Sequence, residues 1–192
     1  MAWTSVKGSR ISEPAHVTAD EGRWVPTTRG INGISADGRW LAIYGAFTRN
    51  LDVYRLPEIE PVAKLTSKSR ISGFSFSPSG DELAIASNGQ VEFWSTKTWE
   101  PTRTATHFLG LPAVGMLFQP DGGALWLAKS LRQTGLFGSA GFEELLPLPN
   151  GMFPLALTAD GRQLAVSVEG RRVQVWDLIA IRQELARLGL DW

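Results

Sequence analysis

Pro78-Ser79-Gly80-Asp81-Glu82-Leu83-Ala84-Ile85 joins a glycine-containing turn to a short apolar strand, and this unit occurs four times in the sequence. The other three copies are residues 36–43, 120–127 and 159–166. Their glycines, at positions 38, 80, 122 and 161, are 42, 42 and 39 residues apart. Recurrence at a fixed period of about 40 residues indicates a repeat architecture.

A second motif recurs in phase with the first, a short strand that ends in an aromatic residue. It is Leu51-Asp52-Val53-Tyr54 in the first copy, and its counterparts are residues 91–94, 134–137 and 173–176. An apolar segment also precedes each turn, at residues 31–35, 71–76, 114–118 and 153–157. Glycine reaches positive φ without a Cβ clash and therefore suits hairpin turns. Each copy predicts a small antiparallel sheet, and the predicted fold class is all-β.

The strand after each turn separates large side chains from small ones. In Leu83-Ala84-Ile85-Ala86 the large residues fall on one face of the strand and the alanines on the other, and residues 41–43 and 164–166 repeat this. Such faces predict sheets packed face to face, about 10 Å apart, with the stack as the folding unit. Helical repeats have related periods, but 20 Gly and 11 Pro interrupt nearly every long window, so strands are favoured.

These residues resemble the WD40-repeat family. The resemblance rests on Phe76-Ser77-Pro78-Ser79-Gly80, on residues 118–122 and on Val173-Gln174-Val175-Trp176-Asp177-Leu178. It implies a β-propeller with about four four-stranded antiparallel blades in residues 31–178. Only Trp176-Asp177 is a true WD dipeptide, and the family's Gly-His pair is missing from every repeat. The closing residues 182–192 are similar to the ends of bacterial WD40 proteins, which are often joined to serine/threonine kinase domains.

The pattern changes at both ends of the repeats. Residues 178–188 are good helix formers, with Asp177 as the expected N-cap and Gly189 as the expected C′ residue. We expect a short amphipathic helix and tail at 179–192 in place of the fourth blade's outer strand, either covering that blade's edge or binding a partner. The N-terminal segment, residues 1–30, holds no complete blade, but residues 23–28 predict one outer strand that could complete a blade.

Propellers in general have about four to eight blades, but WD40-type rings usually have seven or eight, so four blades are few for such a ring. Blades shaped for larger rings subtend too small an angle for four of them to close. One hypothesis is that a second copy supplies the other half, which gives eight blades with twofold symmetry. The alternative is that the upstream blades belong to a longer polypeptide.

Composition excludes several function classes. Of 192 residues, 19 are Lys or Arg and 19 are Asp or Glu, so the formal net charge is zero and nucleic-acid binding is not expected. With no cysteine, disulfides, zinc ribbons and thiol nucleophiles are impossible. The longest apolar stretch, residues 41–47, is far too short to span a membrane. We therefore expect a cytoplasmic protein that contacts neither nucleic acid nor membrane.

Few residues suggest chemistry. His16 and His107 stand apart in polar stretches, and a solvated or structural role is favoured for both. Asp37, Asp121 and Asp160 could suggest calcium, but an aspartate before a turn glycine needs no ion. The glycine-rich residues 135–141 match no phosphate loop and indicate a weak, bulged blade. The sequence therefore assigns no catalytic, cofactor-binding or metal-binding residue.

Seven of the eight tryptophans divide by position. Trp94 and Trp176 are expected in the core, and Trp40 and Trp126 are expected to be half-buried. Those outside the repeated strands would anchor partners if they are exposed; they are Trp24, Trp99 and Trp192.

The leading functional hypothesis is a non-catalytic scaffold that binds proteins or peptides, with no cofactor. The alternatives are a propeller hydrolase or lactonase with a site in its channel, and the sensor or spacer part of a kinase-linked signalling protein.

Overall fold

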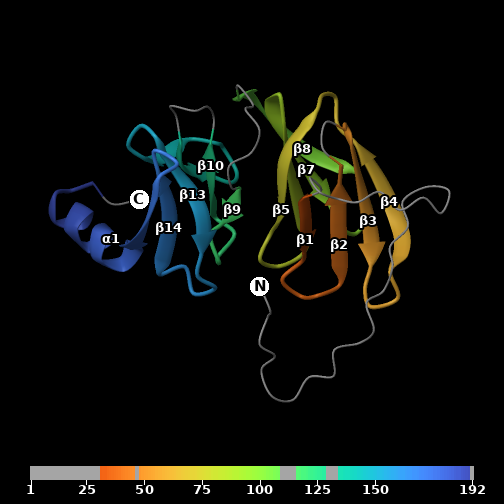
Figure 1. Ribbon diagram of the computed structural model, residues 1–192, viewed down its shortest axis with the longest axis horizontal. Coiled ribbons are helices and arrows are strands. Elements are labelled where there is room, and N and C mark those ends of the chain that lie inside the picture. Colours follow the sequence, from red (N-terminus) through yellow and green to blue (C-terminus); the bar gives the residue numbers. More distant parts are fainter. Residues whose placement is uncertain (1–30, 46–47, 109–115, 129–133, 191–192) are drawn as a thin grey trace, which may run out of the picture.

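A computed structural model describes residues 31–45, 48–108, 116–128 and 134–190. These residues form four antiparallel sheets, which we call blades 1 to 4 in chain order, and one helix (Figure 1). Blade 1 contains β1 (Ile31–Ile34), β2 (Trp40–Tyr44), β3 (Asn50–Arg55) and β4 (Glu60–Thr66). Blade 2 contains β5 (Ile71–Phe76), β6 (Glu82–Ser87), β7 (Gly89–Ser95) and β8 (Pro101–Phe108). Blade 3 contains β9 (Leu117–Phe118), β10 (Ala124–Ala128), β11 (Thr134–Gly138) and β12 (Glu144–Pro147). Blade 4 contains β13 (Met152–Leu157), β14 (Gln163–Val168) and β15 (Arg172–Asp177), and α1 (Leu178–Arg187) follows.

The blades stand side by side around a common centre. Within each blade the strands are ordered as in the sequence, and the first strands contact one another in succession, β1 with β5, β5 with β9, and β9 with β13. In Figure 1 these first strands lie towards the middle of the picture, whereas β4 and α1 lie at opposite edges. The predicted all-β architecture of propeller blades with a short C-terminal helix is therefore confirmed.

The predicted glycine turns join the first and second strands of each blade. The four turn glycines have φ between 71° and 74°, which only glycine adopts without strain, and their positions are 38, 80, 122 and 161. Each donates its N–H to the carbonyl three residues earlier, as Gly38 does to Ser35 at 2.9 Å. In the first turn the Ser35 hydroxyl also donates to Asp37 Oδ1 at 2.6 Å and accepts from the Trp40 N–H.

Successive turns touch. A Cβ added to Gly80 would collide with the Asp37 carboxylate, and one added to Gly161 would lie 2.8 Å from Cδ of Pro120. At Gly122 the nearest atom, Cδ of Pro78, is 3.9 Å away. Each turn glycine after the first therefore packs against the turn of the preceding blade. At Gly38 no described atom lies within 4 Å of where a Cβ would stand.

The core lies between the blades, in three clusters that separate each blade from the next. Between blades 1 and 2, Ala42 and Val53 pack with Leu83 and Ile85. Because strand side chains alternate, the small faces of blades 1 and 2 pack against the large faces of their successors, whereas blade 3 presents Trp126 to blade 4. The middle blades thus bury both faces, which explains why Trp126 is fully buried and not half-buried as expected.

The glycine-rich segment at 135–141 is part of β11 and the following turn, and the register shifts between Leu136 and Phe137, as expected of a bulge. This bulge is not peculiar to blade 3. The pairing register of β3 also shifts between Val53 and Tyr54, and that of β7 shifts between Phe93 and Trp94.

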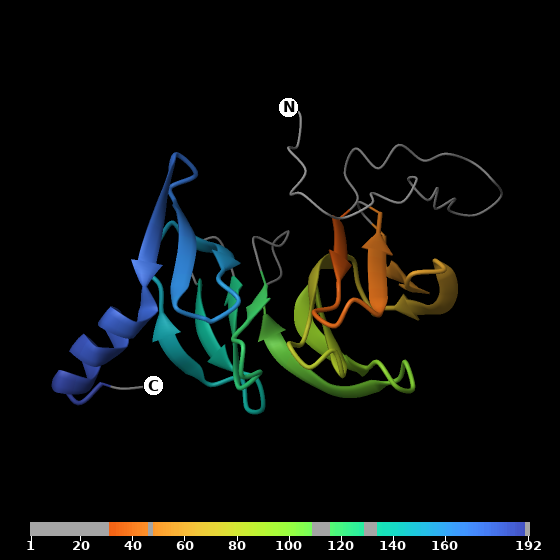
Figure 2. The ribbon, with the colours of Figure 1, turned by 90° about the horizontal axis from the view of Figure 1, so that it is seen from below.

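Helix α1 follows β15 directly, in place of an outer strand. Asp177 caps it by accepting the Ala180 N–H at 3.0 Å, and Gly189 ends it with φ of 73°, both as predicted. Leu178 is buried against blade 4, but Leu188 is 67% exposed. Only the start of the helix covers the blade, and its remainder points away from the strands (Figure 2).

The contact between turns predicts that alanine destabilises the protein more at Gly161 than at Gly122, although the two glycines have nearly the same φ. Gly161→Ala and Gly122→Ala should each cost about 1–2 kcal/mol of unfolding free energy, because alanine is strained at positive φ. Gly161→Ala should cost about 1 kcal/mol more, since its methyl group meets the rigid ring of Pro120. Urea unfolding of both variants measures this, and equal losses would contradict packing between the turns.

The Ser35 hydrogen bond predicts a titration. With smaller help from Arg39, it lowers the pKa of Asp37 to about 2. Because this pKa lies below its unfolded value of about 3.9, the stabilisation is complete above that pH and is lost as the pH falls towards 2. In Ser35→Ala the pKa of Asp37 should rise above about 3 by carboxyl NMR, and in Ser35→Thr it should stay low. An unchanged pKa in Ser35→Ala would contradict this.

Candidate protein interface

The structure disperses the residues that the sequence singled out for chemistry. His16, Trp24 and Trp192 lie outside the described residues, as does the strand predicted at residues 23–28. His107 lies in β8. Within the described parts of the chain, no three His, Cys, Asp or Glu side chains gather closely enough to hold a metal ion.

The turn aspartates are accounted for by their hydrogen bonds. Asp160 accepts from the Thr158 hydroxyl at 2.6 Å and from the Arg162 N–H at 3.1 Å, and the first of these lowers the pKa of Asp160. Asp121 accepts from the Gly123 N–H at 2.9 Å. With Asp37, these carboxylates stand in three different blades, and each completes its own turn.

The first strands, which border the centre, carry no acidic residue or histidine within their described bounds. A channel enzyme of the hydrolase or lactonase type would gather such residues there. Glu92 of β7 is buried, and its Oε1 accepts from the Gln90 side chain at 2.5 Å. Glu92 pairs across the sheet with Ile85, so it faces blade 1 and not the centre.

The tryptophans fill the spaces between blades. Trp94 and Trp176 are partly buried against the core, as expected, and Trp40 is half-buried. Trp99 is not an exposed anchor, because its ring packs edge-on against Trp40, with centroids 5.1 Å apart.

One face of blade 4 has no neighbour among the described residues, although its residues match buried ones in the other blades. Val175 occupies the position of Val53, Phe93 and Leu136, which are at most 1% exposed, but Val175 is 64% exposed. Val173 is 62% exposed. We define the open face of blade 4 as Ala165, Ser167, Val173 and Val175.

Blade 1 has the complementary uncovered face. Leu41 and Ile43 occupy the positions of Leu83 and Ile85, which are fully buried, yet both are only partly buried. Ile34 pairs with Leu41 and is 62% exposed. We define the open face of blade 1 as Ile34, Leu41, Ile43, Asp52 and Tyr54. The second strand presents large side chains on this face, Leu41 and Ile43, whereas it presents small ones, Ala165 and Ser167, on the open face of blade 4.

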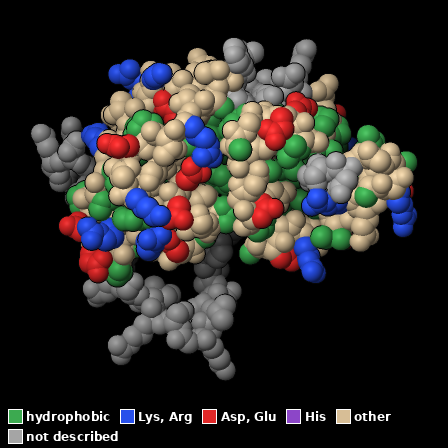
Figure 3. All heavy atoms as spheres, turned by 180° about the vertical axis from the view of Figure 1, so that it is seen from behind, with side chains coloured by type: hydrophobic (Ala, Val, Ile, Leu, Met, Phe, Trp, Pro, Cys, Tyr) green, Lys and Arg blue, Asp and Glu red, His purple; other side chains and the backbone are tan. Residues whose placement is uncertain are grey.

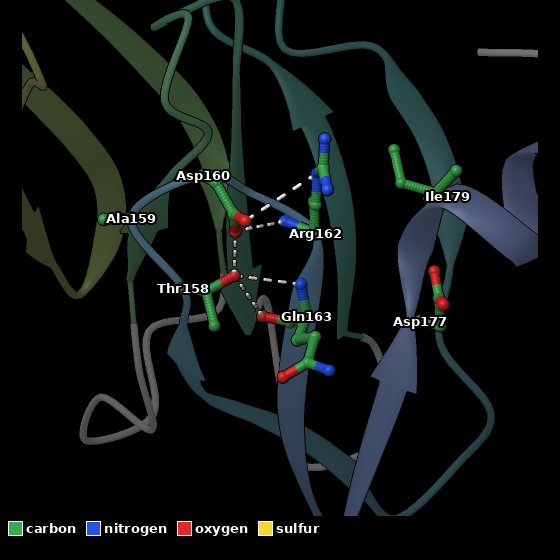
Figure 4. A pocket seen from close by; sticks show the side chains of 7 residues that line it. All are labelled: Thr158, Ala159, Asp160, Arg162, Gln163, Asp177 and Ile179. Carbon is green, nitrogen blue, oxygen red and sulfur yellow. Dashed lines mark hydrogen bonds and ion pairs between the residues drawn. The ribbon is translucent and has the colours of Figure 1, made fainter.

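A hollow of about 880 Å³ adjoins the open face of blade 4, at its turn end (Figure 4). The turn before β14 and the start of α1 form its walls. Its lining residues are Thr158, Ala159, Asp160, Arg162, Gln163, Asp177 and Ile179. Ile179, which is 48% exposed, gives it an apolar wall.

On one face of the molecule, charge does not mark a binding site. On the face seen in Figure 3, basic and acidic side chains are interspersed, without a broad field of one sign. Ion pairs such as Arg55–Glu60, at 2.9 Å, and Arg187–Glu184, at 2.9 Å, are exposed to solvent and add little stability.

The sequence interpretation missed a recurring residue, Ile59, Trp99 or Phe142, which in blades 2 and 3 packs on the preceding blade. Each lies between the third and fourth strands of its blade and has positive φ, of 57°, 55° and 58°. A signal was present, since each is a large apolar residue directly before a glutamate, and they recur in phase with the turn glycines.

The described part of the chain contains no helix that is both long and apolar enough to cross a membrane.

No protein-family model matches the sequence, and no curated protein is similar to it. Among solved structures, the chain is similar to the β-propeller domain of Cps50 (Swd1) from Myceliophteria thermophila, with a TM-score of 0.62 and 20% sequence identity. The match covers 78% of this chain and 52% of that domain, so the chain spans about half the length of the propeller. The repeated blades, their packing and this likeness together show a WD40-like β-propeller fold.

Proposed function

We propose that this chain is a non-catalytic scaffold for protein–protein interactions, which completes a propeller with a second copy or with another blade-bearing chain. The observation that carries the proposal is the pair of open faces at the two ends of the stack. Both expose apolar residues at positions that every interior blade buries. Leaving one valine exposed forgoes about 1.5–3 kcal/mol, so a neighbouring blade would stabilise the chain considerably.

The two open faces differ in kind, and this supports the second copy over other partners. In the first two joints a face whose second strand carries alanines meets one that carries leucine and isoleucine or two leucines, and in the third Trp126 replaces an alanine. The small face of blade 4 suits the large face of blade 1, and a twofold axis makes both contacts at once. The match of the chain to about half of a propeller domain agrees with a half-ring.

Within this proposal the chain has three parts. Residues 31–178 supply the blades, residues 1–30 supply a blade-completing outer strand, and residues 179–192 supply the helix and tail. The scaffold would then offer its outer surfaces to protein or peptide partners, and the centre would take no part in catalysis.

Val175→Asp tests the proposal, with Leu188→Asp as the matched control. Light scattering of the unaltered chain should give at least twice the single-chain mass of 21.0 kDa. Val175→Asp should weaken association at least about tenfold, because an unpaired carboxylate would be buried in the joint. Leu188→Asp changes an equally exposed residue of α1 and should leave the mass unaltered. A single-chain mass for the unaltered protein would overturn the completion by a second copy.

A further inference from the structure

A recurring hairpin links each blade to the one before it. Between the third and fourth strands, Ser95 and Glu100 close a loop in which the Trp99 N–H donates to the Ser95 carbonyl at 2.8 Å. In blade 3 the Phe142 N–H donates to the Gly138 carbonyl at 3.1 Å in the same arrangement. In blade 1 the corresponding residue is Ile59, ahead of Glu60. All three have left-handed backbones, which is uncommon for any residue but glycine and strained for a β-branched one.

In the interior joints this residue is a plug that enters the preceding blade. Trp99 of blade 2 packs on Trp40 of blade 1. Phe142 of blade 3 packs on Phe93 of blade 2, with centroids 5.5 Å apart and rings at 70°. Ile59 has no preceding blade, and of the described core clusters none includes it.

The hollow beside α1 stands at the position of a joint without its plug, although two of its three matching residues differ in type from those of the first joint. The hollow between blades 1 and 2, of about 620 Å³, is lined by Arg39, Trp40 and Arg55, with Trp99 of blade 2 as a further wall. By strand register, Trp40 and Arg55 pair as Gln163 and Asp177 do in blade 4. Arg162 stands at the position of Arg39, directly before the second strand.

We infer that this hollow receives the first hairpin of a second copy, with Ile59 as the plug against Ile179 and Gln163. The inference rests on the proposed function, because it specifies how the open faces of two copies meet. Charges of both signs stand on each side, since the hairpin carries Glu58 and the Arg55–Glu60 ion pair, and the hollow carries Asp160 and Asp177 beside Arg162, whose side chain is 70% exposed. Arg162 is held only loosely, 3.7 Å from Asp160.

Ile59 has a left-handed backbone, although it belongs to no core cluster among the described residues. A β-branched side chain in the left-handed region costs on the order of 1–3 kcal/mol and persists where the surroundings require it. In blades 2 and 3 the same backbone directs an aromatic ring into the joint. In blade 1 it directs Ile59 to where a blade of the second copy would stand.

Disulfide cross-linking tests the plug, because the chain has no cysteine of its own. The Ile59→Cys/Ile179→Cys variant should form a covalent dimer under mild oxidation, seen on a non-reducing gel. Ile59→Cys/Leu188→Cys carries the same number of thiols and should remain largely uncross-linked. In addition, Ile59→Asp should weaken association at least tenfold by light scattering, and Ile59→Val should not.

A second cysteine pair separates failure of the plug from failure of the ring. Ile43→Cys/Val175→Cys reports on the open faces alone, because their counterparts Ile85 and Val53 share one core cluster. If this pair cross-links and the Ile59/Ile179 pair does not, the ring forms and the plug is refuted. If neither pair cross-links and the mass is that of one chain, the completion of the ring by a second copy fails, and the plug fails with it.

Discussion

Face-to-face burial between successive blades is the constraint on which the whole structure depends. A blade exposes an apolar surface on both sides, and neither side can be buried within one sheet. Ala42 and Val53 of one blade are fully buried only because Leu83 and Ile85 of the next cover them. Every blade needs a neighbour on both sides to bury its apolar faces. Among the described residues, the first and last blades each have a neighbour on one side only, so each leaves one apolar face exposed.

The local parts of this architecture could be predicted from sequence because single residues determine them. Gly80 and its counterparts require positive φ, and alternation in Leu83-Ala84-Ile85-Ala86 assigns each side chain to a face. Asp177 is the one aspartate in a WD dipeptide, and it serves as the cap of α1, which its position before good helix formers predicted. These are short-range effects of backbone conformation and periodicity.

The joints could not be predicted in the same way, because they depend on what lies across from each blade. Trp126 looked half-exposed in isolation and is buried because blade 3 is covered on both sides. Trp99 looked like a surface anchor, yet its left-handed backbone turns it onto Trp40. No residue-type preference predicts positive φ for a tryptophan or an isoleucine, so the recurrence of a large apolar residue before a glutamate did not by itself indicate this hairpin. The candidate interface follows from the joints, and it was predicted only as an assembly hypothesis without residues.

The central claim is that every blade face, including the two terminal ones, is covered by a neighbour of the same kind. Small-angle X-ray scattering of the unaltered chain in solution tests it most directly, since a closed disc and an open arc have different pair-distance distributions. The account predicts a compact, twofold-symmetric disc containing two chains. A particle with the mass of one chain, whose curve matches the open arc of four blades, would contradict it.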